Sequence, residues 1–112
     1  MKGKPGRHAP AFVLLELSKG PNYGLQILHQ LKENLPICKL DSAAVYRALS
    51  SLESSGFVTS YTEDIESGVA KRFYTITDEG FKALDQFCED IQMRIKNMEY
   101  FLKTYHEVGG RQ

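Results

Sequence analysis

Apolar and polar residues alternate along the chain with the period of an α-helix in four segments and with the period of a β-strand in two. The first helical segment, "APAFVLLELSKGP", is almost wholly apolar, which predicts a buried helix that ends at Gly20 and Pro21. The second, "YGLQILHQLKENLP", predicts a helix capped by Asn22 and ended by Pro36. Its expected buried stripe consists of Leu25, Ile27, Leu28, Leu31 and Leu35.

A third helix is predicted in "SAAVYRALSSLESSGFV", with Asp41 or Ser42 as N-cap and Gly56 just past its end. Read at 3.6 residues per turn, its buried face consists of Val45, Ala48, Leu49 and Leu52. The opposite face consists of Ser42, Ala43, Tyr46, Arg47 and Ser50. A solvated helix face usually carries Lys, Glu and Gln, whereas this one has a single charge among small residues. We therefore expect another molecule to lie against it.

Two segments of alternating polarity follow the third helix. They are "FVTSYTED" and "AKRFYTIT", and the acidic, glycine-containing "DIESG" between them supplies a loop, so together they predict a β-hairpin. Three helices followed by a hairpin form the winged helix-turn-helix arrangement, in which the third helix enters the DNA major groove and the hairpin reaches the flanking backbone. The predicted fold is therefore mainly α with a small β-hairpin, and residues 1–76 are expected to form a DNA-binding domain.

The rest of the chain, residues 77–112, predicts one long helix from Thr77 to about Tyr105, opened by the cap signal "TDEG". Its apolar residues recur at alternating steps of three and four, the seam of a coiled coil. The seam consists of Phe81, Leu84, Cys88, Ile91, Ile95, Met98, Leu102 and Tyr105. At about 1.5 Å per residue the helix runs to roughly 40 Å, longer than a small winged domain can cover. We expect it to make a homodimer, with "AFVLLEL" of the partner chain packed on its wider apolar face.

Composition narrows the classes of function. With 42% hydrophobic and 25% charged residues the chain is globular, and its longest apolar run, "AFVLL", is far shorter than a membrane span. No membrane association is expected, and the location is predicted to be cytoplasmic. The net charge is zero, but residues 1–50 carry seven basic and three acidic residues, a net +4, whereas residues 77–112 carry five and seven, a net −2. A basic N-terminal half suits a nucleic-acid partner.

From Pro10 to Tyr105 the sequence resembles the PadR family of bacterial transcriptional regulators. The resemblance rests on three motifs taken together, "LSKGPNYG", "VYRALSSLESSGFV" and "KRFYTITDEG". It implies a DNA-binding repressor whose C-terminal helix makes the homodimer, with some members sensing small aromatic molecules at or near the dimer interface. In having a single helix as its C-terminal part, the chain is similar to the compact subfamily.

The DNA-contacting residues expected from this arrangement are Ser42, Ala43, Tyr46 and Arg47 of the third helix, with Lys71 and Arg72 of the hairpin. Arg presents a fork that matches phosphate or guanine edges, so Arg47 is expected to contribute most. The structural alternatives stay open: Tyr46 packs on the domain, Arg47 pairs with Glu53 or Asp41, Ser42 caps the helix, and Lys71 and Arg72 are merely solvated. A basic arm of Lys2, Lys4 and Arg7 either lies along DNA or is disordered.

Leu84, Cys88, Ile91, Ile95, Met98, Leu102 and Tyr105 are the expected dimerisation residues. Met98, Phe101 and Tyr105, with residues of the first helix, are candidates for an effector pocket, the alternative being a filled dimer core. No cofactor or metal is expected, because Cys38, Cys88 and the three histidines lack the close spacing of ligand pairs. An enzyme is not expected, since no catalytic constellation or phosphate loop is present. A metal-responsive winged-helix regulator and a winged helix used only for protein contacts remain the rival functions.

Overall fold

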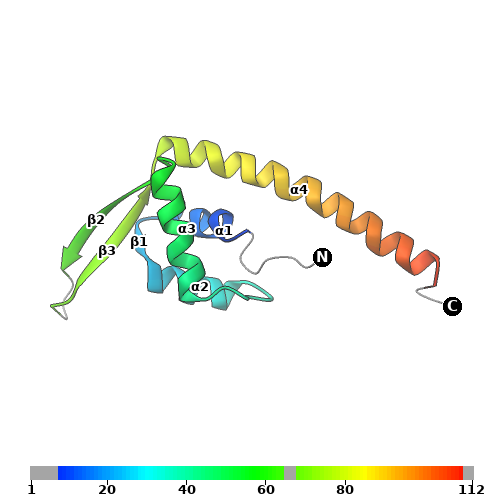
Figure 1. Ribbon diagram of the computed structural model, residues 1–112, viewed down its shortest axis with the longest axis horizontal. Helices are drawn as coiled ribbons and strands as arrows, with labels where there is room; N and C mark the ends of the chain where they lie inside the picture. Colours follow the sequence, from blue (N-terminus) through cyan, green and yellow to red (C-terminus); the bar gives the residue numbers. More distant parts are fainter. Residues whose placement is uncertain (1–7, 65–67, 110–112) are drawn as a thin grey trace.

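The computed structural model describes residues 8–64 and 68–109, and Figure 1 shows a compact head of helices and strands from which one long helix extends. The elements in chain order are α1 (Ala9–Leu17), β1 (Asn22–Tyr23), α2 (Gly24–Asn34), α3 (Ser42–Ser54), β2 (Val58–Asp64), β3 (Ala70–Ile76) and α4 (Asp78–Glu107). The predicted order of three helices, a hairpin and a long helix is confirmed, and the fold is a winged helix with a C-terminal helix.

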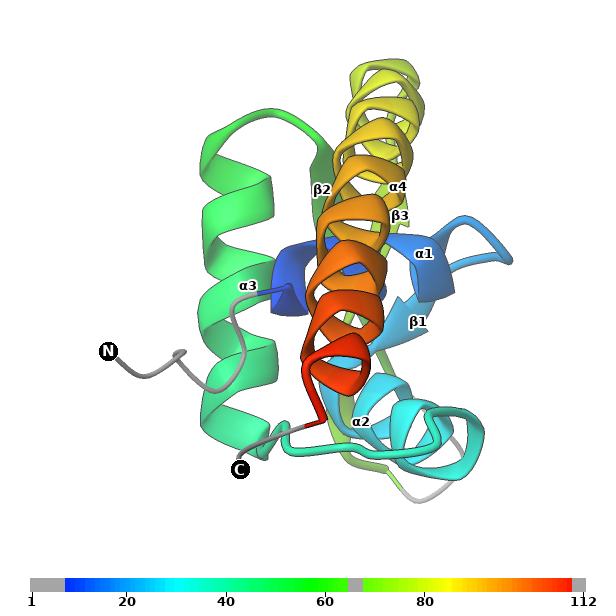
Figure 2. The same ribbon diagram turned by 90° about the vertical axis from the view of Figure 1, so that its right-hand side faces the viewer.

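Helix α1 lies at the centre of the head, in contact with α2, α3 and α4 (Figure 2). Its side chains Val13, Leu14 and Leu17 are fully or almost fully buried. An almost wholly apolar helix has to bury most of its surface, and here three other helices cover α1 except at Leu15, which is 44% exposed. Ile27, Leu31, Leu49 and Val58 complete the centre of the core.

The start of α2 differs from the prediction in two respects. Asn22 does not cap the helix: Asn22 and Tyr23 form β1, which pairs antiparallel with Tyr74 and Phe73 of β3, and the helix begins at Gly24 with Tyr23 as N-cap. Two residues are too few to show a strand periodicity, and only their pairing with β3 makes them a strand. Leu25 was expected in the buried stripe and is 43% exposed, because the neighbouring elements cover the side of α2 that carries Ile27, Leu28 and Leu31.

Helix α3 begins and ends as its sequence indicates. The Asp41 carboxylate accepts a hydrogen bond of 2.9 Å from the backbone N–H of Ala44, which makes Asp41 the N-cap and leaves Ser42 as the first helical residue. At the other end Gly56 has a φ of +81°, and the N–H of Phe57 donates to the carbonyl of Leu52 at 2.9 Å. This pairing is the Schellman motif, which needs a left-handed residue that glycine supplies.

Strands β2 and β3 form the expected hairpin, and β1 adds a third strand on the other side of β3, giving the order β1–β3–β2. Val58 pairs with Ile76 at the base of the hairpin, and Asp64 pairs with Ala70 at its far end. Part of the loop "DIESG" lies outside the described residues. The wing is therefore tied to α2 through β1, as well as to α3 through the chain.

Thr77 joins the wing to α4. Its hydroxyl accepts a hydrogen bond of 3.0 Å from the N–H of Gly80 and donates one of 2.8 Å to the carbonyl of Gly56. Ala83 is buried in the core, and Leu84 and Phe87 pack against it. The division into residues 1–76 and 77–112 stays a prediction, since the first turns of α4 belong to the same core as the head.

Candidate nucleic-acid interface

The two faces of α3 differ as the sequence predicts. Val45, Leu49 and Leu52 are at most 2% exposed, and Ala48 is buried with them. Ser42, Ala43, Tyr46, Arg47 and Ser50 lie on the exposed face. The core therefore uses one side of the helix, and the other side is available to a partner.

Arg47 is exposed and makes no ion pair within residues 8–64 and 68–109. Its two proposed partners are engaged elsewhere. The Asp41 carboxylate caps α3, while Glu53 accepts a hydrogen bond of 2.7 Å from the Ser60 hydroxyl and lies 3.9 Å from the Arg72 guanidinium. The ion-pair alternative for Arg47 is therefore wrong in the described part of the chain, and the guanidinium stays free to bind an external group.

Tyr46 is 49% exposed, and its ring packs against the first residue of α2. A Cβ atom placed on Gly24 would lie 2.5 Å from Cε1 of this ring and 3.0 Å from its hydroxyl oxygen. Packing on the domain and exposure on the outer face thus coexist in one side chain. Nothing in the sequence pairs these two residues, which lie on different helices.

Ser42 is exposed on the first turn of α3, where Asp41 already satisfies the cap. The expectation that the Ser42 hydroxyl caps the helix is therefore wrong. Ser42 and the adjacent Ala43 are exposed in the first turn of α3, at the N-terminal end of the helix. Donors at a helix N-terminus are favourable neighbours for a phosphate.

The two basic residues of the wing lie on opposite faces of β3, as successive residues of a strand do. The Lys71 ammonium lies 5.0 Å from the centre of the Tyr23 ring, an arrangement typical of a cation–π contact. The Arg72 guanidinium lies on the other face, beside Glu53 of α3. Lys71 and Arg72 therefore do not form one basic patch, and part of the Arg72 charge is balanced within the domain.

Sequence reasoning missed an aromatic row on the outer face of the sheet. Phe73 of β3 lies between Tyr23 of β1, at a ring distance of 5.2 Å, and Tyr61 of β2, at 5.8 Å. These residues are in register across the three strands, and the row fixes the wing relative to the start of α2. The alternation of β2 and β3 could have indicated Tyr61 and Phe73, but not the strand that supplies Tyr23.

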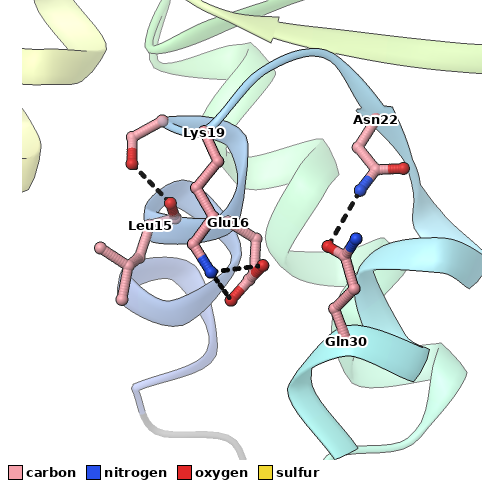
Figure 3. A network of polar contacts seen from close by, with 6 residues as sticks. Leu15, Glu16, Lys19, Asn22 and Gln30 are labelled. Carbon is pink, nitrogen blue, oxygen red and sulfur yellow. Dashed lines mark hydrogen bonds and ion pairs between the residues drawn. The ribbon is translucent and has the colours of Figure 1, made fainter. Parts of the chain in front are cut away.

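Two separate polar contacts lie at the end of α1 and between β1 and α2 (Figure 3). Both oxygens of the buried Glu16 carboxylate accept hydrogen bonds of 3.2 Å from the Lys19 ammonium, and Asn22 donates one of 3.1 Å to Gln30. The Asn22–Gln30 hydrogen bond holds β1 against α2. Together with the pairing of β1 with β3, this hydrogen bond positions the start of α2, where Gly24 lies.

The N-terminal end of α3 and the far ends of β2 and β3 lie on the same side of the head. In Figure 1 the N-terminal end of α3, α2 and the far end of the hairpin all lie at the lower side, and α4 crosses the opposite side. A duplex at the lower side would meet the start of α3 together with the far ends of β2 and β3. The basic arm of Lys2, Lys4 and Arg7 lies outside the described residues.

Helix α4 leaves most of its apolar residues uncovered. Leu84 and Ile91 are half-buried, Cys88 is exposed, and the exposed fractions of Ile95, Met98, Leu102 and Tyr105 run from 47% to 61%. Beyond Ala83 no described residue of α4 is buried. A stripe of this length on a single helix is typical of a surface that a second chain covers.

A cleft of about 380 Å³ lies between α1 and the first half of α4. Its walls are almost entirely apolar and consist of Ala11, Phe12, Leu15, Leu84, Asp85, Phe87, Cys88, Ile91 and Gln92. None of the three candidate effector residues, Met98, Phe101 and Tyr105, lines this cleft. Those three lie farther along α4, exposed, with the Phe101 and Tyr105 rings stacked at 6.2 Å.

Other kinds of site have little support in the described residues. No group of three or more His, Cys, Asp and Glu side chains is close enough to hold a metal ion there. Cys38, in the loop before α3, and Cys88, on α4, are both free thiols. No helix of the described part is long and apolar enough to cross a membrane.

Residues 13–86 match the family described as "Transcriptional regulator PadR-like family". The chain belongs to this family. The match covers more than half of the sequence and includes α3, the whole described wing and the first turns of α4. The match confirms the resemblance to this family that the motifs indicated. Because the family consists of transcriptional regulators, it also confirms the expectation that the chain is not an enzyme.

Solved structures of similar proteins agree with this assignment. A PadR family transcription regulator from Clostridium difficile R20291 is 27% identical with a TM-score of 0.72, and the match covers 85% of this chain and 98% of that one. A transcriptional regulator from Clostridium thermocellum is 26% identical with a TM-score of 0.74, covering 84% and 92%. Bacillus subtilis PadR, crystallised with operator DNA, is 29% identical with a TM-score of 0.67, covering 75% of this chain and 48% of that one. No curated protein matches the chain by sequence.

Proposed function

We propose that this PadR-family protein is a homodimeric repressor that binds a palindromic operator through the exposed face of α3. The observation that carries the proposal is Arg47, exposed on α3 and without an ion-pair partner in residues 8–64 and 68–109. A guanidinium on a face of small residues can enter the major groove and bind guanine or phosphate. The operator complex of the similar Bacillus subtilis PadR supports DNA as the partner.

Ser42 and Ala43 complete the proposed contact at the N-terminal end of α3, where small side chains let the helix approach the duplex closely. Lys71 and Arg72 are proposed to meet phosphates beside the major groove. The Glu53 carboxylate, 3.9 Å from the Arg72 guanidinium, offsets part of its charge, so we expect Arg72 to contribute less to DNA binding than Arg47. The wing then adds affinity without adding sequence preference, as phosphate contacts do.

The homodimer is supported by the uncovered apolar stripe of α4. We propose that the stripe packs antiparallel against the same helix of a second chain, so that Met98, Leu102 and Tyr105 of each copy reach the cleft between α1 and α4 of the other. The apolar walls of that cleft, Phe12 and Leu15 among them, fit such side chains. In a two-fold dimer each chain offers the same surface to its partner, so one pairing covers both clefts.

An effector site is a finer proposal that depends on this dimer. Met98, Phe101 and Tyr105 are proposed to line a pocket for a flat aromatic or apolar molecule, closed by residues of the partner's first helix. Their exposure in the single chain supports a surface that is completed only on pairing. A dimer core filled by the side chains themselves remains the alternative, and the cytoplasmic location stays a prediction from the sequence.

Two other functions remain as alternatives. A winged helix used only for protein contacts would leave DNA unbound, and a metal-responsive regulator would need ligands from both copies, because the described residues of one chain hold no group of three. Both are distinguished from the proposal by the same experiment. The purified chain is mixed with a randomised double-stranded DNA library, bound duplexes are recovered, and a recovered duplex is footprinted with and without a chelator.

The expected result is a palindromic sequence protected at two half-sites about one turn, roughly 34 Å, apart, because a two-fold dimer presents two α3 helices to one side of the duplex. Recovery of no enriched sequence would contradict the proposal and favour the protein-contact module. Protection that is lost on adding the chelator would favour the metal-responsive regulator.

A further inference from the structure

Gly24 lies at the junction of three parts of the domain. It is the first residue of α2, it directly follows the strand residue Tyr23, and it is buried beneath the ring of Tyr46 from α3. Its φ is not in the left-handed region. The described glycines with a positive φ are Gly20, Gly56, Gly68 and Gly109. The backbone at this position would therefore accept any residue, and only the missing side chain makes glycine necessary.

The atoms that fill the space of the missing side chain all belong to Tyr46. A Cβ on Gly24 would lie 2.5 Å from Cε1, 2.8 Å from Cζ and 3.0 Å from the hydroxyl oxygen. Carbon atoms in contact prefer a separation of about 3.5 to 4 Å, so a methyl group here would displace the end of the ring by about 1 Å. Because those atoms are the far end of a side chain, the ring can swing away without disturbing the core.

The Tyr46 hydroxyl has the features of a group that serves a partner. Within residues 8–64 and 68–109 it makes no hydrogen bond. The side chain is 49% exposed and directly precedes Arg47, which has no ion-pair partner in the same residues. A hydroxyl at the edge of a recognition helix can donate to a phosphate oxygen, and such bonds require a donor–acceptor distance of 2.5 to about 3.0 Å. A displacement of about 1 Å at the hydroxyl is enough to break one.

We propose that Gly24 is a positioning residue for DNA binding: by leaving room for the Tyr46 ring, it sets the place from which the Tyr46 hydroxyl donates a hydrogen bond to a DNA phosphate. The inference rests on the proposed function, because it requires α3 to face the duplex. It adds a residue of α2 that contacts no DNA itself and acts through α3. It also gives the Asn22–Gln30 hydrogen bond and β1 a part in DNA binding, since together they position the start of α2.

The test is a double-mutant cycle on a duplex recovered from the randomised library by the wild-type chain. The variants are Gly24→Ala, Tyr46→Phe and the two combined, with Tyr100→Phe on the exposed outer side of α4 as the matched control. Binding is measured by fluorescence anisotropy of the labelled duplex at physiological salt. Folding is checked by circular dichroism and by the thermal midpoint of each variant.

Tyr46→Phe keeps the ring on Gly24 and removes only the hydroxyl, so we expect it to fold and to weaken binding about tenfold, the loss typical of one hydrogen bond to a charged group. Gly24→Ala should fold and weaken binding by a similar factor. The combined variant should bind no more weakly than Tyr46→Phe alone, because no hydrogen bond is left to displace. Tyr100→Phe should bind as the wild type does.

Several results would overturn the inference. Wild-type affinity of Tyr46→Phe would show that the hydroxyl makes no contact, whatever Gly24→Ala does. Additive losses in the combined variant would show that Gly24 acts by another route, and failure of Gly24→Ala to fold would show that the ring does not swing away. Failure of the proposed function is a separate result, in which the wild-type chain binds no duplex and Arg47→Ala has nothing to weaken.

Discussion

Replacing Ile95 by Asp tests whether α4 pairs with a second copy of itself. Ile95 lies on the apolar stripe near the middle of α4, and its side chain is 49% exposed in the single chain. Ile95 belongs neither to the core nor to the side chains packed against it, so the head should fold unchanged. If the stripe is a dimer interface, each copy places one new carboxylate in it.

The size of the effect follows from the exposed half of the side chain. Burying a whole Ile contributes roughly 1.5 to 3 kcal/mol, so the half that remains exposed is worth about 1 kcal/mol per copy and about 2 kcal/mol per dimer. Each carboxylate adds a desolvation penalty of several kcal/mol on top of this loss, so the dimer should be destabilised by at least about 4 kcal/mol. That corresponds to a dissociation constant raised at least about a thousandfold.

Sedimentation velocity over a range of concentrations measures this directly, with Asn97→Asp as the matched control. Asn97 lies on α4 two residues away, exposed and off the apolar stripe, so the same charge there should leave the dimer intact. We expect wild type and Asn97→Asp to sediment as dimers at micromolar concentration and Ile95→Asp as a folded monomer. A wild-type monomer at that concentration, or an Ile95→Asp dimer as stable as the parent, would refute the reasoning.

Three further variants test the head. If Arg47 contacts a base, Arg47→Ala should weaken binding to a recovered operator duplex by about 1 to 3 kcal/mol and leave the thermal midpoint unchanged. The control Lys82→Ala removes the same charge from α4 and should bind as the wild type does. Both are measured by an anisotropy titration. If Arg47 contacts a phosphate instead, Arg47→Ala should weaken binding to all DNA sequences alike. The slope of the logarithm of the binding constant against the logarithm of the salt concentration should then fall by about one. Thr77→Ala removes the cap of α4, so urea unfolding should show a loss of about 1 to 2 kcal/mol that Thr77→Ser largely restores. Gly80→Ala would press a methyl group onto the Phe57 carbonyl, and its midpoint in urea should fall by more than that of Thr77→Ala.

Much of the fold could be predicted because its signals are local. The buried face of α3, the Schellman end at Gly56 and the cap by Thr77 each depend on residues within a few positions of one another. The alternation in β2 and β3 likewise predicts the hairpin from sequence alone. The order of these elements and their short connections favour one arrangement, so the sequence alone predicts the winged helix.

The sequence by itself determined which side of α3 is apolar, where α3 begins and ends, and that α4 carries more apolar surface than the head can cover. Only the tertiary structure decided that Asn22 and Tyr23 form a strand, that Glu53 turns to Arg72 and leaves Arg47 free, and that Tyr46 rests on Gly24. The physical reason is that a periodicity or a cap is a property of neighbouring residues, whereas these contacts join residues about 20 to 50 positions apart. Such partners are selected by the packing of whole elements.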